Sequence, residues 1–228
     1  MRTGFGWHAA PMSPDTDPRP RAAGADDAHR LVVLLDEDGR PCGTARKDEV
    51  HTTNTALHLA FSCWVFDQDG RTLVTRRSPA KLTWPGVWTN SFCGHPEPGE
   101  DLADAVTRRG WDELGARLTD VRSVLPQFRY RAVSASGIVE NEVCPVYTAR
   151  LASAVDPHPD EVAELRWMSL DDLRERTVTE RELYSPWMLD QLDQLDQLGQ
   201  LGQLGQPGQP GQPGQPGLSG PGAVPAAG

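Results

Sequence analysis

The residues best suited to chemistry lie in the stretch WTNSFCGHP, which begins at Trp88 and places a cysteine two residues before a histidine. Side chains two positions apart on an extended segment point to the same side, so Cys93 and His95 are expected to face one pocket. A second stretch, GIVENEVCPV, repeats this spacing with Glu140 and Glu142. One thiol, one imidazole and two carboxylates predict a metal site beside an acid–base pair, which is typical of an enzyme.

A predicted helix between these two stretches carries charged residues on an apolar stripe. Residues Gly99–Gly115 contain no proline, and a glycine stands at the end of the segment, which favours a helix. One face of it presents Leu102, Val106, Arg109 and Glu113. If this face points inward, the two charges must be paired or metal-bound. The alternative is an ordinary ion pair, four residues apart, on a solvated face.

The remaining pattern indicates the elements that must position these groups. Apolar runs bounded by turn residues predict strands. They are expected at Arg30–Leu35, in a hairpin of Leu59–Phe66 with Thr72–Arg77, in an antiparallel pair of Ser123–Val133 with Ile138–Arg150, and at Glu161–Met168. Ser169 is expected to cap a following helix. Together these elements predict an α+β fold, a mixed β-sheet flanked by helices in an α/β/α sandwich.

Composition divides the chain of 228 residues into three parts. Residues 1–28 hold prolines among alanines and acidic residues, without an apolar run, and are expected to be a disordered extension. Residues 29–190 are expected to form one domain with its own core. Residues 191–228 consist largely of LDQ, LGQ and PGQ triplets, which predict a disordered low-complexity tail. A short helical extension through its first leucines is left open.

Charge and cysteine content narrow the class of protein. The net charge of −10 argues against a general nucleic-acid binder, so an anionic ligand would need local positive charge. The sequence shows neither a signal-peptide core nor an apolar run that approaches a membrane span. Four cysteines without an export signal favour a cytoplasmic protein with reduced thiols, and two disulfides are the alternative.

A spaced set of glycine, glutamate and arginine residues overlaps the predicted helix. The pattern G-x5-E-x7-R-x4-E-x-G is met by Gly94, Glu100, Arg108, Glu113 and Gly115. This pattern resembles a Nudix box, the strand–loop–helix unit that binds a metal–diphosphate. Arg109 and Asp112 stand where the hydrolases of this superfamily use glutamates. The carboxylates that hold catalytic magnesium for pyrophosphate hydrolysis are therefore partly missing.

Further sequence segments make the resemblance more specific. His51 and His58 bracket the segment TTNTAL, and the blocks VTRRSPAKLTWPGVWTNSFCGHP, FRYRA, GIVENEVCPV and SPWM follow in that order. Together they resemble type I isopentenyl-diphosphate isomerase over essentially the whole of residues 29–190. The resemblance implies a 1,3 proton shift that converts isopentenyl diphosphate to dimethylallyl diphosphate, the electrophile of isoprenoid biosynthesis.

The resemblance also implies a role for each matching residue. One divalent ion, manganese or zinc, would be bound by His51, His58, His95, Glu140 and Glu142. A magnesium ion that also touches the substrate diphosphate would be bound by Glu113. The diphosphate itself would be bound by Lys47, Arg77, Lys81 and Arg109, with help from Arg76. The catalytic pair would be Cys93 and Glu142, with Tyr130 beside Glu142 and Trp187 over the hydrocarbon. Because a metal favours the carboxylate form of Glu142, we hypothesise that Tyr130 relays the proton.

Several alternatives stay open at this point. Cys93 is also compatible with a small buried residue, and Trp187 with a cap on the core. The histidines are compatible with loop positions, and Glu140 and Glu142 with a solvated strand face. A Nudix pyrophosphohydrolase and a non-catalytic diphosphate-binding protein are the competing functions. A small-molecule substrate is the expected partner, without nucleic acid or membrane, and the protein is expected to be a monomer.

Overall fold

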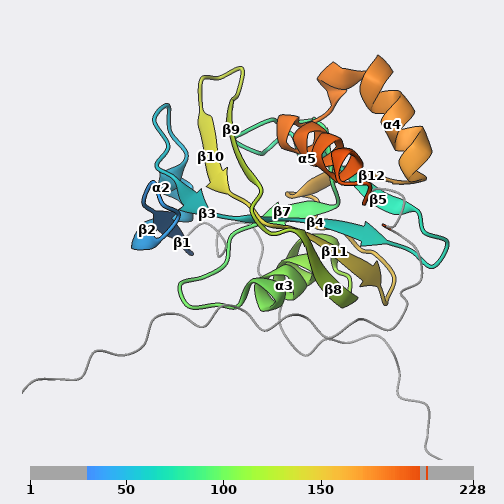
Figure 1. The fold of residues 1–228 in the computed structure, drawn as a ribbon, viewed down its shortest axis with the longest axis horizontal. Helices are drawn as coiled ribbons and strands as arrows, with labels where there is room; N and C mark the ends of the chain where they lie inside the picture. The colour runs from blue at the N-terminus through green and yellow to red at the C-terminus, as the bar shows by residue number, and fades with distance from the viewer. Residues whose placement is uncertain (1–29, 201–203, 205–228) are drawn as a thin grey trace, which may run out of the picture.

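The protein contains two β-sheets in a computed structural model that describes residues 30–200 and 204 (Figure 1). The first sheet has the order β2–β1–β3–β10–β9, and the second β12–β5–β4–β11–β8, with β6 on β5 and β7 on β4. The strands of the first are β1 (Leu31–Leu35), β2 (Pro41–Arg46), β3 (His58–Leu59), β9 (Arg129–Val133) and β10 (Val139–Val143). Those of the second are β4 (Phe61–Phe66), β5 (Thr72–Arg77), β6 (Trp88–Thr89), β7 (Phe92–Gly94), β8 (Leu118–Leu125), β11 (Val146–Leu151) and β12 (Val162–Met168).

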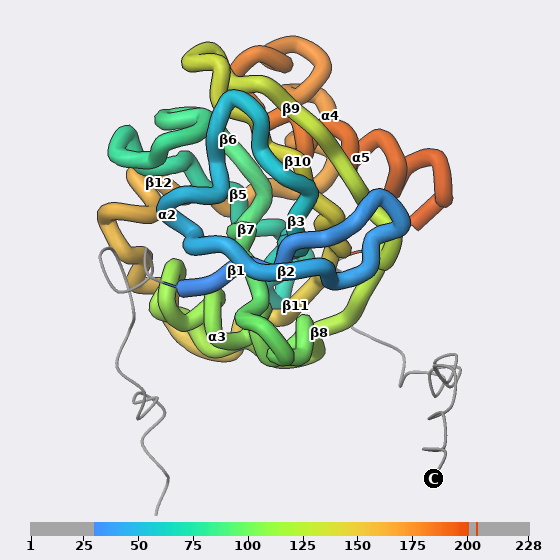
Figure 2. Tube along the Cα trace, turned by 90° about the vertical axis from the view of Figure 1, so that its left-hand side faces the viewer, coloured from blue at the N-terminus to red at the C-terminus, as the bar shows by residue number. Residues whose placement is uncertain are grey.

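Helices cover both faces of the second sheet. Helix α3 (Leu102–Leu114) lies on one face, and α4 (Leu170–Thr179) and α5 (Pro186–Gln197) lie on the other (Figure 1). The short helix α2 (Lys47–Val50) follows β2, and a 3₁₀ turn, η1 (Arg181–Leu183), precedes α5. Viewed from the side, the β1–β2 hairpin and α2 lie in front of β3 and β7 (Figure 2). This arrangement confirms the expected α+β fold, with two mixed sheets where one was expected.

Strand β4 is the centre of the core because both of its faces are buried. All six of its residues are buried, and they alternate between two apolar clusters. Phe61, Cys63 and Val65 pack toward α3, whereas Trp64 and Phe66 pack toward α5. Consecutive side chains of a strand point to opposite faces of the sheet. Because β4 has apolar side chains on both faces, each face must be covered by other elements. The sandwich follows from this strand.

Helix α3 has its apolar stripe facing inward, one of the two possibilities that the sequence left open. Asp101 caps its start by accepting a hydrogen bond from the amide of Ala103, and Gly115 ends it with a φ of 60°. Arg109 is 2% exposed and Glu113 7% exposed. The alternative of an ion pair on a solvated face is therefore wrong.

The antiparallel pair predicted at Ser123–Val133 and Ile138–Arg150 is split between the two sheets. Strand β9 pairs with β10 in the first sheet, and β8 pairs with β11 in the second. Pro126 and Pro145 stand at the two breaks. Proline has no amide hydrogen to donate to a strand ladder, so each interrupts the pairing. The chain passes from one sheet to the other at these points.

The folded domain extends further along the chain than the sequence led us to expect. Helix α5 continues past residue 190 to Gln197, and Leu192 and Leu195 are buried against the core. The boundary expected at residue 190 is therefore too early, because the leucine spacing of the first triplets continues the apolar face of α5. The predicted extension at residues 1–28 and most of the tail lie outside the described residues. No helix among residues 30–200 has the length and apolar character needed to cross a bilayer.

Close packing at Gly94 gives a test of this arrangement. A Cβ at this position would lie 2.8 Å from Cγ of Arg109 and 2.9 Å from Cζ of Phe61. We expect Gly94→Ala to lower the free energy of unfolding by about 1–3 kcal/mol, because overpacking a rigid core strains its neighbours. Urea unfolding measures this, with Gly43→Ala as the control, since the nearest atom there is 3.8 Å away. Equal stability of the two variants would contradict the packing described.

Candidate active site and metal centre

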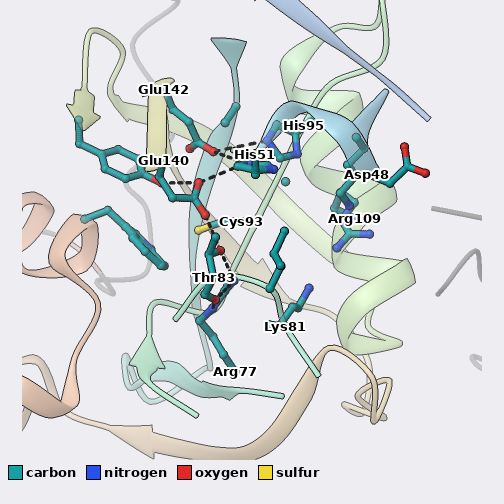
Figure 3. Close-up of a pocket in the computed structure, with 16 residues that line it drawn as sticks. Asp48, His51, Arg77, Lys81, Thr83, Cys93, His95, Arg109, Glu140 and Glu142 are labelled. Carbon is teal, nitrogen blue, oxygen red and sulfur yellow. Dashed lines mark hydrogen bonds and ion pairs between the residues drawn. The ribbon is translucent and has the colours of Figure 1, made fainter. Parts of the chain in front are cut away.

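Three histidines and one glutamate converge between the two sheets. His51 follows α2, His58 begins β3, His95 follows β7, and Glu142 lies on β10. Strands β3 and β10 run parallel with His58 opposite Glu142, which places these two side chains together. One ligand atom of each of the four residues lies within 4.8 Å of those of the others. Figure 3 shows the side chains of His51, His95 and Glu142 close to one another.

The donor set fits a divalent metal ion. Nδ1 of His58 lies 2.9 Å from the carbonyl oxygen of Ala56, which can only accept, so Nδ1 carries the hydrogen and Nε2 is left with a lone pair. Nε2 of His58 and Nε2 of His95 each lie 3.4 Å from Oε1 of Glu142. Both nitrogens are buried and lack a hydrogen bond within the part of the chain that is described. Buried nitrogen lone pairs around a carboxylate suit a metal of the manganese or zinc type.

The protonation states of this cluster follow from burial and charge. Burial lowers the pKa of His95 to about 3, against the opposite effect of Glu142. Burial would also lower the pKa of His51, but Glu140 and Glu142 outweigh it and raise the value to about 9. Burial would raise the pKa of Glu142, but the three histidines hold it well below its usual range. Glu142 is therefore ionised and His95 neutral at pH 7, the forms that bind a metal.

Glu140 lies beside the four-residue cluster, on the same face of β10. Its Oε2 lies 3.4 Å from Nε2 of His51 and accepts a 3.4 Å hydrogen bond from the hydroxyl of Tyr130. Its Oε1 accepts a 2.6 Å hydrogen bond from the hydroxyl of Thr83. Tyr130 pairs opposite Glu142 in the ladder of β9 and β10, yet its hydroxyl contacts Glu140. Thr83 was not singled out in the sequence, because nothing in its local pattern indicates that its loop reaches β10.

Cys93 faces the same cavity from β7. Its sulfur lies 3.2 Å from the hydroxyl of Ser62 and 3.5 Å from Oδ1 of Asn90. Burial raises the pKa of Cys93 to about 12, although Ser62 and Asn90 act in the opposite direction. The sulfur therefore carries its proton at pH 7 and can act as an acid. Ser62 and Asn90 were both missed in the sequence, since a buried serine or asparagine carries no motif of its own.

Aromatic rings form part of the cavity wall. Trp187 is buried at the start of α5, with its ring centroid 5.7 Å from that of Tyr130 and 5.3 Å from that of Trp84. The guanidinium of Arg77 lies 5.4 Å from the indole centroid. Trp187 thus packs on the core as a structural residue would, and it also lines the cavity.

The four cations expected to bind an anion all line this cavity: Lys47, Arg77, Lys81 and Arg109. Figure 3 labels Arg77, Lys81 and Arg109, which lie below the histidines in that view. Arg77 donates hydrogen bonds to the carbonyl oxygens of Thr83 and Trp84. Arg76, by contrast, pairs with Glu164 at 2.5 Å and lies outside the cavity lining.

Two acidic residues accompany these cations. Arg109 lies 2.8 Å from Glu113 and 3.6 Å from Glu161, and Lys81 forms an ion pair with Glu161. Burial lowers the pKa of Lys81 to about 7, against the opposite effect of Glu113. The sequence pattern did not identify Glu161, which lies just before β12 and meets these cations only in the folded chain.

The cavity has a volume of about 360 Å³ and brings most of the predicted residues together. Its lining includes the thiol, both carboxylates of β10, the tyrosine, the tryptophan and the four cations. His58 lies behind the lining in the metal cluster, and Glu113 lies behind Arg109. A polar end and an apolar wall in one small cavity suit a ligand with an anionic head and a short hydrocarbon.

Comparison with known proteins agrees with this geometry. The NUDIX domain model matches residues 56–188. A protein named isopentenyl-diphosphate Delta-isomerase from Clavibacter michiganensis is 59% identical over 162 residues, 71% of this chain and 84% of that one. A protein of the same name from Frankia alni is 55% identical over 168 residues, 74% of this chain and 87% of that one.

Solved structures support the fold. The crystal structure of DR0079 from Deinococcus radiodurans matches with a TM-score of 0.55 and 18% identity, and the match covers 74% of this chain and 98% of that one. At this identity the likeness concerns the fold alone. The family model covers more than half of the chain and the two relatives share over half of the aligned residues. The chain therefore belongs to the NUDIX family and, within it, to the isopentenyl-diphosphate Delta-isomerases.

Proposed function

We propose that this protein converts isopentenyl diphosphate to dimethylallyl diphosphate. The observation that carries the proposal is the thiol of Cys93 and the carboxylate of Glu142 on the wall of one cavity that four cationic residues also line. The cations suit a diphosphate, and the aromatic wall suits a five-carbon chain. Relatives that bear the isomerase name over most of their length support the same reaction.

The reaction moves one proton onto the alkene and removes another from the allylic carbon. We assign the acid to Cys93: its S–H bond breaks, the electron pair stays on sulfur, and the alkene π pair forms the new C–H bond. We assign the base to Glu142, which takes the allylic proton while the C–H pair becomes the new double bond. Positioned acid and base groups typically supply about 10²–10⁴-fold in rate.

Trp187 is proposed to stabilise the positive charge that develops on the tertiary carbon. An indole face attracts a cation by roughly 2 kcal/mol or more when both are desolvated. Trp187 is 2% exposed, so water competes little for that charge. Lys47, Arg77, Lys81 and Arg109 are proposed to bind the diphosphate, whose charge favours the protonated form of Lys81.

Two metal ions complete the proposal. The histidine cluster with Glu140 and Glu142 would hold manganese or zinc, which orients these carboxylates in the wall of the cavity. Glu113 would hold magnesium together with the diphosphate oxygens, the style of binding that this hydrated ion prefers. Breaking the Arg109–Glu113 contact would free this carboxylate as the substrate arrives.

We also propose an oligomeric state and a cellular compartment for the protein. Large exposed apolar side chains among the described residues are scattered rather than contiguous, which supports a monomer: Leu31, Leu82, Val133, Val178, Leu183 and Leu198. The four cysteines are unpaired in the structure, which is compatible with reduced thiols in the cytoplasm.

The first test is NMR of the purified protein with isopentenyl diphosphate and magnesium in deuterated buffer. We expect dimethylallyl diphosphate that has incorporated deuterium, and a loss of about 10²–10⁴-fold in rate for Cys93→Ala. Cys42→Ala, at an exposed cysteine, is the matched control and should retain the rate. Released phosphate with an unchanged alkene would instead indicate a hydrolase, and saturable binding without turnover a non-catalytic binder.

Metal binding is tested by stability. Manganese or zinc at 100 times its dissociation constant should raise the free energy of unfolding of the chelator-treated protein by about 2.7 kcal/mol. His58→Leu should abolish this gain, whereas His158→Leu should keep it, because His158 lies outside the cluster. The measurement is urea unfolding with and without the ion. An equal gain in both variants would rule out the histidine cluster as the site.

The role of Tyr130 is tested by Tyr130→Phe. If the hydroxyl relays a proton through the carboxylate that it contacts, Glu140, we expect kcat to fall by roughly tenfold or more with KM little changed. Steady-state kinetics measure both parameters. An unchanged kcat would exclude the relay and leave Tyr130 as part of the aromatic wall.

A further inference from the structure

A chain of buried hydrogen bonds with a defined direction ends at the sulfur of Cys93. The indole nitrogen of Trp64 lies 2.9 Å from Oε1 of Gln191. An indole N–H can only donate, so the oxygen of this amide must face Trp64. The amide nitrogen of Gln191 therefore faces the other way and donates to the hydroxyl oxygen of Ser62 at 2.9 Å. Trp64, Gln191 and Ser62 are each fully buried, so no water competes for these bonds.

This direction decides what the Ser62 hydroxyl can do. Its oxygen accepts from Gln191, so its single hydrogen remains to be donated. The available acceptors are two sulfurs, Cys93 at 3.2 Å and Cys144 at 3.4 Å. The shorter contact is to Cys93, the sulfur that faces the cavity.

A second side-chain amide, that of Asn90, contacts the same sulfur. Nδ2 of Asn90 donates to the carbonyl oxygens of Cys63 and Phe92, at 3.0 and 2.8 Å. Its Oδ1 accepts from the hydroxyl of Thr89 at 2.9 Å and from the indole nitrogen of Trp187 at 3.2 Å, and it lies 3.5 Å from the sulfur of Cys93. Because this oxygen can only accept, the Cys93 S–H points toward it. One amide thus holds both the thiol and the indole.

We propose that Ser62 and Asn90 are positioning residues for Cys93, an inference that rests on the isomerase function proposed above. Asn90 holds the thiol through its hydrogen, and Ser62 donates a hydrogen bond to the sulfur. A hydrogen bond to a neutral sulfur is weak, whereas one to an anionic sulfur is charge-assisted and strong. The Ser62 bond therefore strengthens as the S–H bond breaks and the electron pair stays on sulfur. Interactions that strengthen in this way lower the barrier rather than tighten substrate binding.

Kinetics separate this role from simple packing. Ser62→Ala is expected to lower kcat by about 100-fold, the scale of one lost buried donor in an oxyanion site, with KM little changed. The urea midpoint should fall as well, because the buried amide of Gln191 loses its acceptor. Ser62→Thr, which keeps the hydroxyl, should recover most of the loss in kcat. Ser91→Ala is the matched control, since Ser91 is also fully buried but its hydroxyl bonds to the backbone of Val65 and Leu73, and it should keep the wild-type kcat.

Two kinetic outcomes would overturn the proposal. One is a kcat for Ser62→Ala equal to that of the wild type. The other is an equal loss of kcat in Ser91→Ala, which would make Ser62 a packing residue. Both are distinct from a failure of the proposed function itself, in which the wild-type protein does not isomerise the substrate at all.

A spectroscopic measurement tests the geometry without any turnover. The infrared S–H stretch of Cys93 is isolated by subtracting the spectrum of Cys93→Ala from that of the wild type. Because the S–H donates to Asn90, Asn90→Ala should move this band to higher wavenumber, and Ser91→Ala should leave it in place, since the Ser91 hydroxyl bonds to the backbone of Val65 and Leu73. A band that stays in place in Asn90→Ala would overturn the assignment of Asn90, whatever the activity of the enzyme.

Discussion

The burial of Glu142 among three imidazoles is the interaction on which the rest of the site depends. An isolated carboxylate inside a protein would lose its charge, because water no longer stabilises it. Here His51, His58 and His95 surround it and keep it ionised. These residues come from four separate segments, so the cluster can form only when the two sheets are joined correctly. The chemistry and the fold are therefore coupled at this point.

The position of this cluster also organises the cavity. The metal-binding group, the carboxylates, the aromatic rings and the cations all border this one cavity. A bound diphosphate would therefore place its hydrocarbon between the thiol and the carboxylates. The protein has a net charge of −10, so the attraction for an anion arises from the local set of cations rather than from the overall field.

Cys93 and Glu142 illustrate how two groups in one cavity acquire opposite protonation states. Burial dominates at the sulfur and raises its pKa, which keeps the proton in place. At Glu142 the neighbouring histidines outweigh burial and keep the proton away. An acid and a base can thus coexist at pH 7 in a single small space, which is what a proton shift across an alkene requires.

The sequence by itself determined the chemical groups and most of the elements. The spacing of Cys93 with His95 and of Glu140 with Glu142 indicated a shared face, because alternate residues of an extended chain point the same way. The stripe on α3 was recognised from its spacing, but the burial of its charged end was left open and was decided by the structure. The hairpin of β4 and β5 and the cap at Ser169 follow equally from local pattern.

Only the tertiary structure decided which groups meet across long stretches of chain. The splitting of one predicted strand pair over two sheets, at Pro126 and Pro145, separates the metal-binding strand from its continuation. The contact of Thr83 with Glu140 and that of Gln191 with Ser62 join residues far apart in sequence. Ser, Thr, Asn and Gln side chains carry no periodic signal, because their roles depend on the partner that folding brings near. The direction of each buried hydrogen bond is set by that partner, and so it can be read only from the folded chain.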